Sequence, residues 1–372
     1  MRYVTLGDVC KKASSNVAQK DILSNDGKYP IYGASGRIKT VNFYHQEQAY
    51  IAIVKDGAGV GRTMLLPEHS SVIGTMQYII PNELVDIKYL YYAIVYMDLA
   101  KYYRGAAIPH IYFKDYQKEL LKLPMLSEQR RIAAIFEKID SIIKRRNLQL
   151  LQLEQAVKSR FIELFGDPVI NPMGWSVSEL SKHIQFLTSG SRGWAKYFTD
   201  TGEYFITIKN VKNCRITLDD IQHINPPNNA EAKRTRVQEG DLLISITADL
   251  GRTGVVTKEI SDYGGYINQH LTCIRLNQSH VRPLYVAYYM ESDAGKEQFK
   301  SKNQSAVKAG LNFNSINTLR LMVPPVELQD SFIAFVEQTD KSKYYSQKFL
   351  TLCRSAVNIY EQEWMKCQTL IF

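Results

Sequence analysis

The stretch that decides the fold occurs twice, as Leu123-Pro-Met-Leu-Ser-Glu-Gln129 and as Val323-Pro-Pro-Val-Glu-Leu-Gln329. The same separation continues without a gap through the helical residues that follow each copy, as in Asp140 and Asp340. Self-similarity at a fixed separation indicates a duplicated structural unit. We therefore expect an internal repeat with a pseudo-two-fold relation between its halves.

A long amphipathic helix is predicted after each copy of this stretch. Its apolar residues recur at alternating steps of three and four, which is the pattern of a coiled-coil seam. A helix of about 37 residues spans roughly 55 Å, so it needs a partner along its length. The other helix supplies one, and we expect an antiparallel coiled coil. The predicted seam residues are Ile132, Phe136, Ile139, Ile143, Leu150, Leu153 and Val157, with Phe332, Val336, Leu350, Val357, Tyr360 and Trp364.

Prolines and a glycine mark the ends of these helices. Pro124 and Pro324 stand where a helix can begin, and Gly166-Asp-Pro168 ends the first one. Basic residues at Lys144–Arg146 and at Lys343 interrupt the seam, either to fix its register or to reach solvent. The fold class is α+β, with two similar α/β domains separated by the long helices. The expected segments are domain 1 at 1–123, helix 124–168, domain 2 at 169–323 and helix 324–372.

The domain that precedes each helix reads as short strands and turns. Gly61-Arg-Thr63 in the first domain matches Gly251-Arg-Thr253 in the second, so a strand, a tight turn and a strand are expected around both. The expected strand pairs are Tyr50–Lys55 with Arg62–Leu66 and Asp241–Thr247 with Arg252–Thr257. An amphipathic helix is expected at Ile87–Tyr103, and its counterpart near Pro283.

Composition indicates a soluble globular protein of more than one domain: 372 residues, 45% hydrophobic and 22% charged. No uncharged apolar run reaches the ~18–20 residues of a membrane span, and the N-terminus lacks a signal-peptide core, so we expect a cytoplasmic protein. Five scattered cysteines predict free, mostly buried thiols and no metal site. A net charge of +9 fits a nucleic-acid partner and a plainly solvated basic surface equally well.

The order domain, helix, domain, helix resembles the specificity subunits of type I restriction–modification enzymes. So do the phrases LPMLSEQRRIAAIFEKIDSIIKRR at 123–146 and FIELFGDPVINPMGW at 161–175, while LTSGSRGWAKYF at 187–198 and YPIYGASGRI at 29–38 resemble the start of a target-recognition domain. The resemblance covers nearly the whole chain. The second helix departs from it, since Leu328-Gln-Asp-Ser-Phe332 stands where the first has Glu128-Gln-Arg-Arg-Ile132.

The resemblance implies a non-catalytic DNA-recognition subunit. Each domain is then a target-recognition domain that reads one half of a bipartite site in double-stranded DNA, and the helices set the spacer between the halves. Two modification subunits are implied as partners, which carry S-adenosylmethionine and the adenine-methylating centre. Restriction (translocase/nuclease) subunits, separate or fused, are implied to join them. No cofactor is expected in this chain.

Two other functions are weighed against this one. Asn225-Pro-Pro227 is similar to the catalytic loop of adenine methyltransferases, but Asn228 replaces the aromatic residue that stacks on a flipped base. A proline turn accounts for it better. Gly57–Gly61 lacks the Gly-Lys-[Ser/Thr] ending of a phosphate-binding loop, so a hairpin turn is expected. A coiled-coil scaffold that binds protein or nucleic acid without sequence preference is the remaining alternative.

The best candidate for base reading is Ser189-Gly-Ser-Arg-Gly-Trp194, with Ser191, Arg192 and Trp194. Its glycines let a backbone approach DNA, Arg192 can fork onto guanine, and Trp194 can pack on a sugar or base. A solvated Arg192 and a Trp194 core anchor are equally consistent. The other candidates lie in turns and loops rich in hydrogen-bond donors: Arg37, Arg62, Arg104, His110, Lys114, Arg252, Lys302, Lys308 and Asn312. For Arg62 and Arg252, the arginines of the two Gly-Arg-Thr sequences, a turn-stabilising role remains open.

Overall fold

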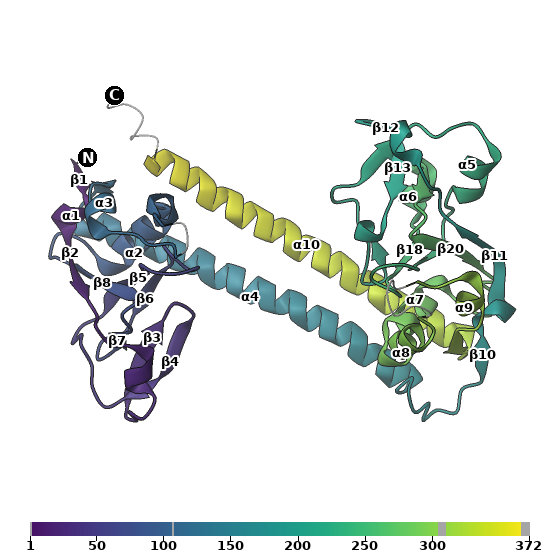
Figure 1. Cartoon of the computed structure of the whole chain (residues 1–372), viewed down its shortest axis with the longest axis horizontal. Helices are drawn as coiled ribbons and strands as arrows, with labels where there is room; N and C mark the ends of the chain where they lie inside the picture. The colour runs from purple at the N-terminus through teal and green to yellow at the C-terminus, as the bar shows by residue number, and fades with distance from the viewer. Residues whose placement is uncertain (1, 106–107, 304–309, 366–372) are drawn as a thin grey trace. The chain divides into compact units, whose positions relative to one another are not determined.

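The structure is a computed structural model that describes residues 2–105, 108–303 and 310–365, with side chains only as far as residue 359 (Figure 1). The chain divides into two compact units. Unit 1 consists of residues 1–149 and 346–372, and unit 2 of residues 150–345. Each unit therefore contains one domain and part of each long helix.

Unit 1 is built on a sheet with the strand order β2-β8-β5-β6. Every residue of β5 is buried, and helix α2 lies against this sheet. A smaller sheet has the order β4-β3-β7, and β1 pairs with β9 directly before the long helix. The elements are β1 (Arg2–Thr5), α1 (Leu6–Val9), β2 (Cys10–Ser14), η1 (Gln19–Ile22), β3 (Tyr29–Gly33), β4 (Gly36–Val41), β5 (Tyr50–Val54), β6 (Thr63–Leu66), β7 (Ser71–Val72), β8 (Met76–Pro81), α2 (Ile87–Tyr96), η2 (Leu99–Tyr102), α3 (Phe113–Tyr116) and β9 (Leu120–Leu123).

Unit 2 repeats this plan with larger insertions. Its main sheet has the order β11-β20-β17-β18, which matches β2-β8-β5-β6 strand for strand, and β10 pairs with β21 as β1 does with β9. A second sheet has the order β12-β16-β13-β19. The elements are β10 (Val177–Glu179), η3 (Leu180–His183), β11 (Ile184–Ser189), η4 (Trp194–Tyr197), β12 (Phe198–Thr199), β13 (Glu203–Ile206), η5 (Ile208–Asn210), β14 (Val211–Lys212), β15 (Arg215–Ile216), β16 (Gln222–Ile224), α5 (Ala230–Thr235), β17 (Leu242–Ser245), β18 (Thr253–Val255), α6 (Lys258–Tyr263), β19 (Gly265–Ile267), β20 (Leu271–Leu276), α7 (Pro283–Glu291), α8 (Asp293–Ser301), α9 (Phe313–Asn317) and β21 (Arg320–Met322).

The two long helices are α4 (Leu126–Phe165) and α10 (Val326–Met365), so both begin two residues after the prolines that were predicted to precede them. Gly166 ends α4 with a φ of 77°, in the left-handed region that disfavours residues with a side chain. The expected helix at Ile87–Tyr103 stops early, because Asp98 turns the backbone left-handed with a φ of 45°. Its counterpart α7 starts at Pro283, as predicted.

Within unit 2 the helices pack in antiparallel fashion. The ring of Phe332 lies 5.3 Å from that of Phe161 and 5.7 Å from that of Phe165. Farther along α10, Phe335 lies under the Arg160 guanidinium, earlier in α4. In unit 1 the Arg146 guanidinium lies 5.3 Å from the centre of the Phe349 ring, at the register that antiparallel pairing predicts.

The side chains of the expected seam differ in how deeply they are buried. Phe332, Val336 and Leu350 are buried on α10. The buried polar residues Thr339 and Ser346 continue the same stripe between Val336 and Leu350. Polar side chains therefore occupy the middle of the α10 stripe, where sequence inspection anticipated only Lys343. The other predicted residues with described side chains are buried (Phe136, Val157) or half-buried (Ile132, Ile139, Ile143, Leu150, Leu153, Val357), while the side chains of Tyr360 and Trp364 lie outside the described residues.

The start of each long helix is attached to its domain by one buried glutamine. The Gln129 amide accepts from the Asp86 N–H at 2.7 Å and donates to the carbonyls of Leu84 and Pro124 at 3.1 and 2.9 Å. Neither Gln129 nor Gln329 exposes any surface to solvent. Gln329 repeats the same three bonds with the Arg282 N–H and the carbonyls of His280 and Pro324, at 2.8, 3.2 and 2.9 Å.

A charged pair beside each glutamine is reversed between the units. In unit 1 the helix carries the cation: the Arg130 guanidinium lies 3.7 Å from the Asp86 carboxylate. In unit 2 the helix carries the anion, and Arg282 donates to both oxygens of Asp330 at 2.6 and 2.8 Å. These bonds hold the pKa of Asp330 below its ordinary value. The hydrogen bonds of the glutamine are thus the same in both units, while the charges of the neighbouring ion pair are reversed.

The predicted free thiols are confirmed at Cys10, Cys214, Cys273 and Cys353, of which the first three are buried, while Cys367 lies outside the described residues. Burial raises the pKa of the Cys10 and Cys214 thiols to about 12. Across the part of the chain that the structure describes, no helix combines the length and apolar character needed to cross a membrane. The same residues hold no cluster of three or more metal-ligating side chains.

Replacing either glutamine by alanine should destabilise its unit. Gln329→Ala leaves the Arg282 N–H and two carbonyls without their partner, and we expect a loss of about 2–4 kcal/mol in the free energy of unfolding. Gln129→Ala should act alike. Chemical denaturation of the full chain measures this against Gln155→Ala and Gln347→Ala, which replace exposed glutamines of the same helices and should cost less than about 0.5 kcal/mol. Equal shifts in all four variants would refute the attachment role.

Candidate nucleic-acid interface

The β5–β6 turn is the centre of a group of loops in unit 1. The Val54 N–H donates to the Arg62 carbonyl and the Gly61 N–H to the Val54 carbonyl, both at 2.9 Å, so residues 55–61 form the expected hairpin turn. Gly61 has a φ of 85°, and a Cβ there would lie 2.7 Å from the Ala100 nitrogen. Only glycine fits this position without strain, which explains the glycine in Gly-Arg-Thr.

A second loop, between Arg104 and His110, lies against this turn. The Gly57 N–H donates to the Pro109 carbonyl at 2.9 Å, and the Ile111 N–H to the Lys55 carbonyl at 3.0 Å. The His110 imidazole also contacts the Asp56 carboxylate through a hydrogen bond. This bond leaves His110 half-buried and occupied within the protein.

A third turn, at the end of the β3–β4 hairpin, meets the same surface. The Arg62 guanidinium donates to the Ala34 carbonyl at 2.8 Å, which joins the two turns. Arg37 follows this turn and is exposed. Arg104 is also exposed, 3.5 Å from the Asp115 carboxylate, and Lys114 lies over the Tyr112 ring. The three turns and loops thus bring together Arg37, Arg62, Arg104 and His110, which are far apart in the sequence.

Unit 2 contains the same arrangement. The Ser245 N–H donates to the Arg252 carbonyl at 2.9 Å and the Gly251 N–H to the Ser245 carbonyl at 3.0 Å, as in the first hairpin. Gly251 has a φ of 81°, and a Cβ there would overlap the Phe299 ring. The Leu311 N–H donates to the Ile246 carbonyl at 2.9 Å, just as Ile111 does to Lys55. The matched Gly-Arg-Thr sequences therefore mark equivalent turns.

The loop that begins at Ser189 joins this group through the turn at Asn268–His270. The Ser191 N–H donates to the Ile267 carbonyl at 2.9 Å, and the Gln269 N–H donates to the Ser191 carbonyl at 3.1 Å. A Cβ on Gly190 would lie 2.1 Å from the Asn268 carbonyl oxygen. This glycine therefore allows close approach to a neighbouring strand of the protein, and the expectation that it serves approach to DNA is corrected.

Two members of the best sequence candidate are part of the core. Trp194 is 4% exposed, packs near Phe205 and Tyr266, and its indole N–H donates to Glu231 at 3.3 Å. The ring is therefore not available to pack on a base, and the core-anchor interpretation holds. Ser191 is 1% exposed and its hydroxyl is bonded to that of Thr235. Arg192 alone of the three is exposed, with no hydrogen bond or ion pair among the described residues.

The remaining unit 2 candidates are occupied within the protein. Arg252 donates to the Asp249 carboxylate across its own turn at 2.5 Å, which favours the turn-stabilising role. Lys302 donates to the Thr318 hydroxyl at 2.8 Å. The Asn312 side chain caps helix α9 by accepting from the Ser315 N–H. Lys308 lies outside the described residues.

Sequence inspection missed Asn268-Gln-His270, which forms the turn between β19 and β20. Its backbone is bonded to both neighbouring loops, since the Ile246 N–H donates to the His270 carbonyl at 3.0 Å. Gln269 and His270 are half-exposed beside Arg192. A run of three amide and imidazole side chains after an apolar strand was the available signal.

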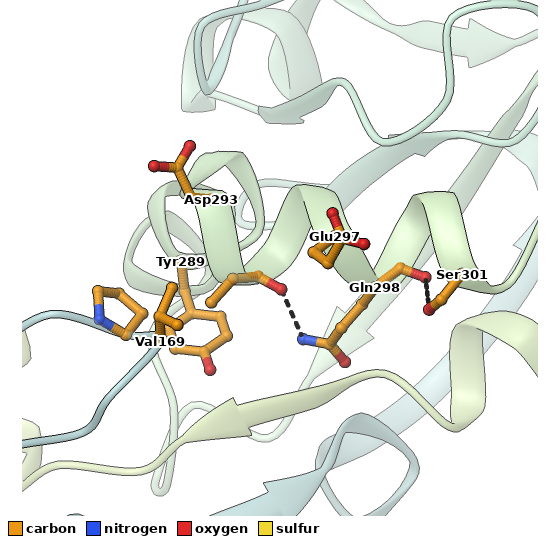
Figure 2. A pocket seen from close by; sticks show the side chains of 8 residues that line it. Val169, Tyr289, Asp293, Glu297, Gln298 and Ser301 are labelled. Atoms are coloured by element: carbon orange, nitrogen blue, oxygen red, sulfur yellow. Dashed lines mark hydrogen bonds between the residues drawn. The ribbon is translucent and has the colours of Figure 1, made fainter.

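Two other features lie apart from these loops. Residues 225–228 form the loop before α5, where Asn229 caps the helix, as a proline turn predicts. A cavity of about 490 Å³ lies between the loop at Pro168–Val169 and α8, and Figure 2 shows its lining. The charged side chains of its lining are the exposed carboxylates Asp293 and Glu297. These groups disfavour a bound phosphate, so the lining itself does not indicate a phosphate site.

Comparison with known proteins identifies the family. The model of the type I restriction modification DNA specificity domain matches residues 1–154 and again residues 174–348. The chain belongs to this family. Each match covers one domain and the first part of the long helix that follows it, so the internal repeat is a repeat of this domain.

Curated relatives are specificity subunits of type I restriction enzymes. The chain is 22% identical over 264 residues to the EcoBI specificity subunit of Escherichia coli, a match that covers 63% of this chain and 54% of that protein. It is 25% identical over 179 residues to the MjaVIII specificity subunit of Methanocaldococcus jannaschii, covering 44% of this chain and 42% of that protein. These alignments span about half the length of the relatives.

Solved structures show that the fold extends over the whole chain. An S subunit of a type I restriction–modification system from M. genitalium aligns with a TM-score of 0.67 at 13% identity, over 98% of this chain and 95% of that one. A chain from a structural study of complex assembly and conformational transition of the type I R-M system aligns with a TM-score of 0.55 at 17% identity, over 98% and 96%. The predicted fold of two similar α/β domains with two antiparallel long helices is confirmed.

Exposed, unpaired arginines should contribute most to DNA binding. Arg37→Ala and Arg192→Ala should each weaken duplex binding about 5-fold or more and lower the dependence of log Kd on log salt by about one. Arg252→Ala should change binding less than about twofold, because Asp249 already holds that side chain. Anisotropy titrations of the full chain with its assembled partners measure this, with Lys182→Ala, an exposed lysine at the opposite end of β11 from the Ser189 loop, as the charge-matched control. Equal losses for Lys182→Ala would assign the effect to net charge.

Proposed function

We propose that this chain is the DNA-recognition subunit of a type I restriction–modification complex, in which each unit reads one half of a bipartite site. The observation that carries this proposal is the repeated loop group. Both units hold the same hairpin turn by equivalent backbone bonds, and in both the residue after the adjoining loop, Ile111 or Leu311, donates to the residue after the first hairpin strand segment, Lys55 or Ile246. Outside the shared Gly-Arg-Thr sequence, most side chains on these loops differ between the units, as two readers of different half-sites require.

The backbone bonds supply the rigidity that sequence reading needs. Base edges are discriminated by hydrogen bonds of defined geometry, so the reading side chains must stand on a fixed backbone. Loops bonded to one another through carbonyls and N–H groups leave side chains free to change without loss of the scaffold. This arrangement suits a protein whose target changes while its fold is kept.

We propose further that the chemistry belongs to partner subunits. Two modification subunits would supply S-adenosylmethionine and the adenine-methylating centre, and restriction subunits would join them. In this proposal the chain itself carries no catalytic centre, and its two recognition domains select where the partners act. The partners would dock on the helices α4 and α10, of which one follows each recognition domain.

Mapping of methylated sites tests the proposal. The full chain, co-expressed with a modification subunit of its own restriction–modification system, should methylate adenines within two short defined sequences separated by a spacer of undefined sequence. Methylation of a plasmid library followed by modification-sensitive sequencing reads both half-sites at once. The modification subunit alone is the control and should show no such site. A single continuous target, or methylation by the isolated chain, would contradict the proposal.

The helices should set the length of the spacer. Three heptads inserted into α4 after Gln149 and into α10 after Tyr345, opposite points of the antiparallel register, add roughly 32 Å of helix to each. That is close to one turn of duplex DNA, about 34–36 Å, so the readers would return to the same face. We expect unchanged half-sites and a spacer about 9–10 base pairs longer.

The same methylation mapping measures the spacer of the lengthened chain. A variant with three heptads in α4 only is the control, since it mismatches the two helices and should lose stability rather than gain a new spacer. An unchanged spacer in the doubly lengthened chain would refute the measuring role.

A further inference from the structure

We infer that Gln269 reads an adenine in the half-site recognised by unit 2, and that His270 holds its amide in the orientation required. This inference rests on the proposed function and assigns a base-reading residue to it. The observation that carries it is a chain of side-chain hydrogen bonds, from Thr247 through His270 to Gln269, on a turn whose backbone is fixed.

The chain of bonds has a single consistent direction. The Gln269 amide nitrogen lies 3.1 Å from Nε2 of His270. An amide nitrogen only donates, so Nε2 of His270 must be the acceptor and the ring proton must sit on Nδ1. Nδ1 lies 2.6 Å from the Thr247 hydroxyl, which accepts that proton. Thr247 thus selects the tautomer of His270, and His270 in turn fixes the Gln269 amide.

The free edge of Gln269 has the pattern that matches adenine. One N–H of the amide is used by His270, so one N–H and the carbonyl oxygen remain without a bond among the described residues. In the major groove adenine presents N7 as an acceptor beside the N6 amino group as a donor. When His270 takes the N–H that points away from the carbonyl oxygen, the other N–H and the oxygen stand side by side, and this pair matches the edge of adenine and of no other single base.

The backbone beneath Gln269 is held on every side. Its own N–H donates to the Ser191 carbonyl at 3.1 Å, the Asn268 N–H donates to the Ile206 carbonyl at 3.1 Å, and the Leu271 N–H closes the turn onto the Asn268 carbonyl at 3.1 Å. Through Ser191 the turn adjoins Arg192, whose side chain is exposed. Little conformational freedom is left to lose on binding, which favours discrimination.

Unit 1 has no equivalent side chain. There the Lys55 N–H donates to the Thr75 carbonyl as Ile246 does to His270, and the Gly74 N–H donates to the Val17 carbonyl as Gln269 does to Ser191. Gly74 therefore occupies the position of Gln269. The same backbone turn carries a reading amide in one unit and none in the other, so the adenine preference belongs to one half-site only.

Base preference at each position of the methylated site tests the inference. In the full complex, Gln269→Ala should lower the preference for adenine at one position of one half-site about 10-fold or more, and leave the other half-site and the spacer unchanged. Gln269→Glu should move the preference at that position toward cytosine, whose amino group a carboxylate accepts. Gln278→Ala, at an exposed glutamine of the same unit, is the matched control and should change no position.

His270→Ala tests the positioning role. It should weaken the adenine preference at that same position and no other, whereas a merely structural role would reduce binding at all positions together. Unaltered preference at every position in both Gln269 variants, in a complex that still methylates a bipartite site, would overturn the inference alone. Absence of a bipartite site in the unmodified complex would instead overturn the proposed function.

Discussion

The rest of the structure depends on two buried glutamines, each of which bonds the first turn of a long helix to the domain before it. A primary amide has two donors and a carbonyl acceptor, and Gln129 and Gln329 each use them on one N–H and two carbonyls. The backbone groups that Gln129 bonds belong to the segment before α2 and to the proline before α4. Those that Gln329 bonds belong to the segment before α7 and to the first proline before α10. Because an unpaired buried amide costs about 1–3 kcal/mol per lost partner, neither glutamine tolerates replacement without a change in its surroundings.

With that attachment fixed, the surroundings have diverged. The ion pair beside each glutamine has opposite polarity in the two units. In unit 1 the helix contributes Arg130 and the domain contributes Asp86, whereas in unit 2 the helix contributes Asp330 and the domain contributes Arg282. The helices also differ in detail, since α10 buries Thr339 and Ser346 where an uninterrupted seam would be apolar. Most side chains on the interface loops differ between the units, while the backbone bonds of the two Gly-Arg-Thr turns stay equivalent. Because a hydrogen bond between main-chain groups does not depend on the neighbouring side chains, this scaffold keeps its shape when the loop side chains change.

The site was predictable in its parts but not in its assembly. Arg37, Arg62, Arg104 and His110 were recognised as donors in loops, yet only the fold brings their three loops onto one surface. The sequence left Trp194 open between a base contact and a core anchor, because an aromatic residue in a glycine-rich loop looks the same in sequence whether it faces a core or solvent. Gln269 was overlooked although Asn268-Gln-His270 is a local run of polar side chains, because only the fold brings Thr247 to His270 and so fixes the orientation of the glutamine amide.

The sequence by itself determined the duplication, the two long helices and the tight turns at Gly61 and Gly251. These follow from local rules: the spacing of apolar residues, the effect of proline on helix starts and the backbone freedom of glycine. Tertiary structure alone decided which donors are spent inside the protein and which remain for a ligand. Arg252 and Trp194 are used internally, while Arg192 and one edge of Gln269 are left free. That division depends on contacts between residues distant in the chain, which no local pattern records.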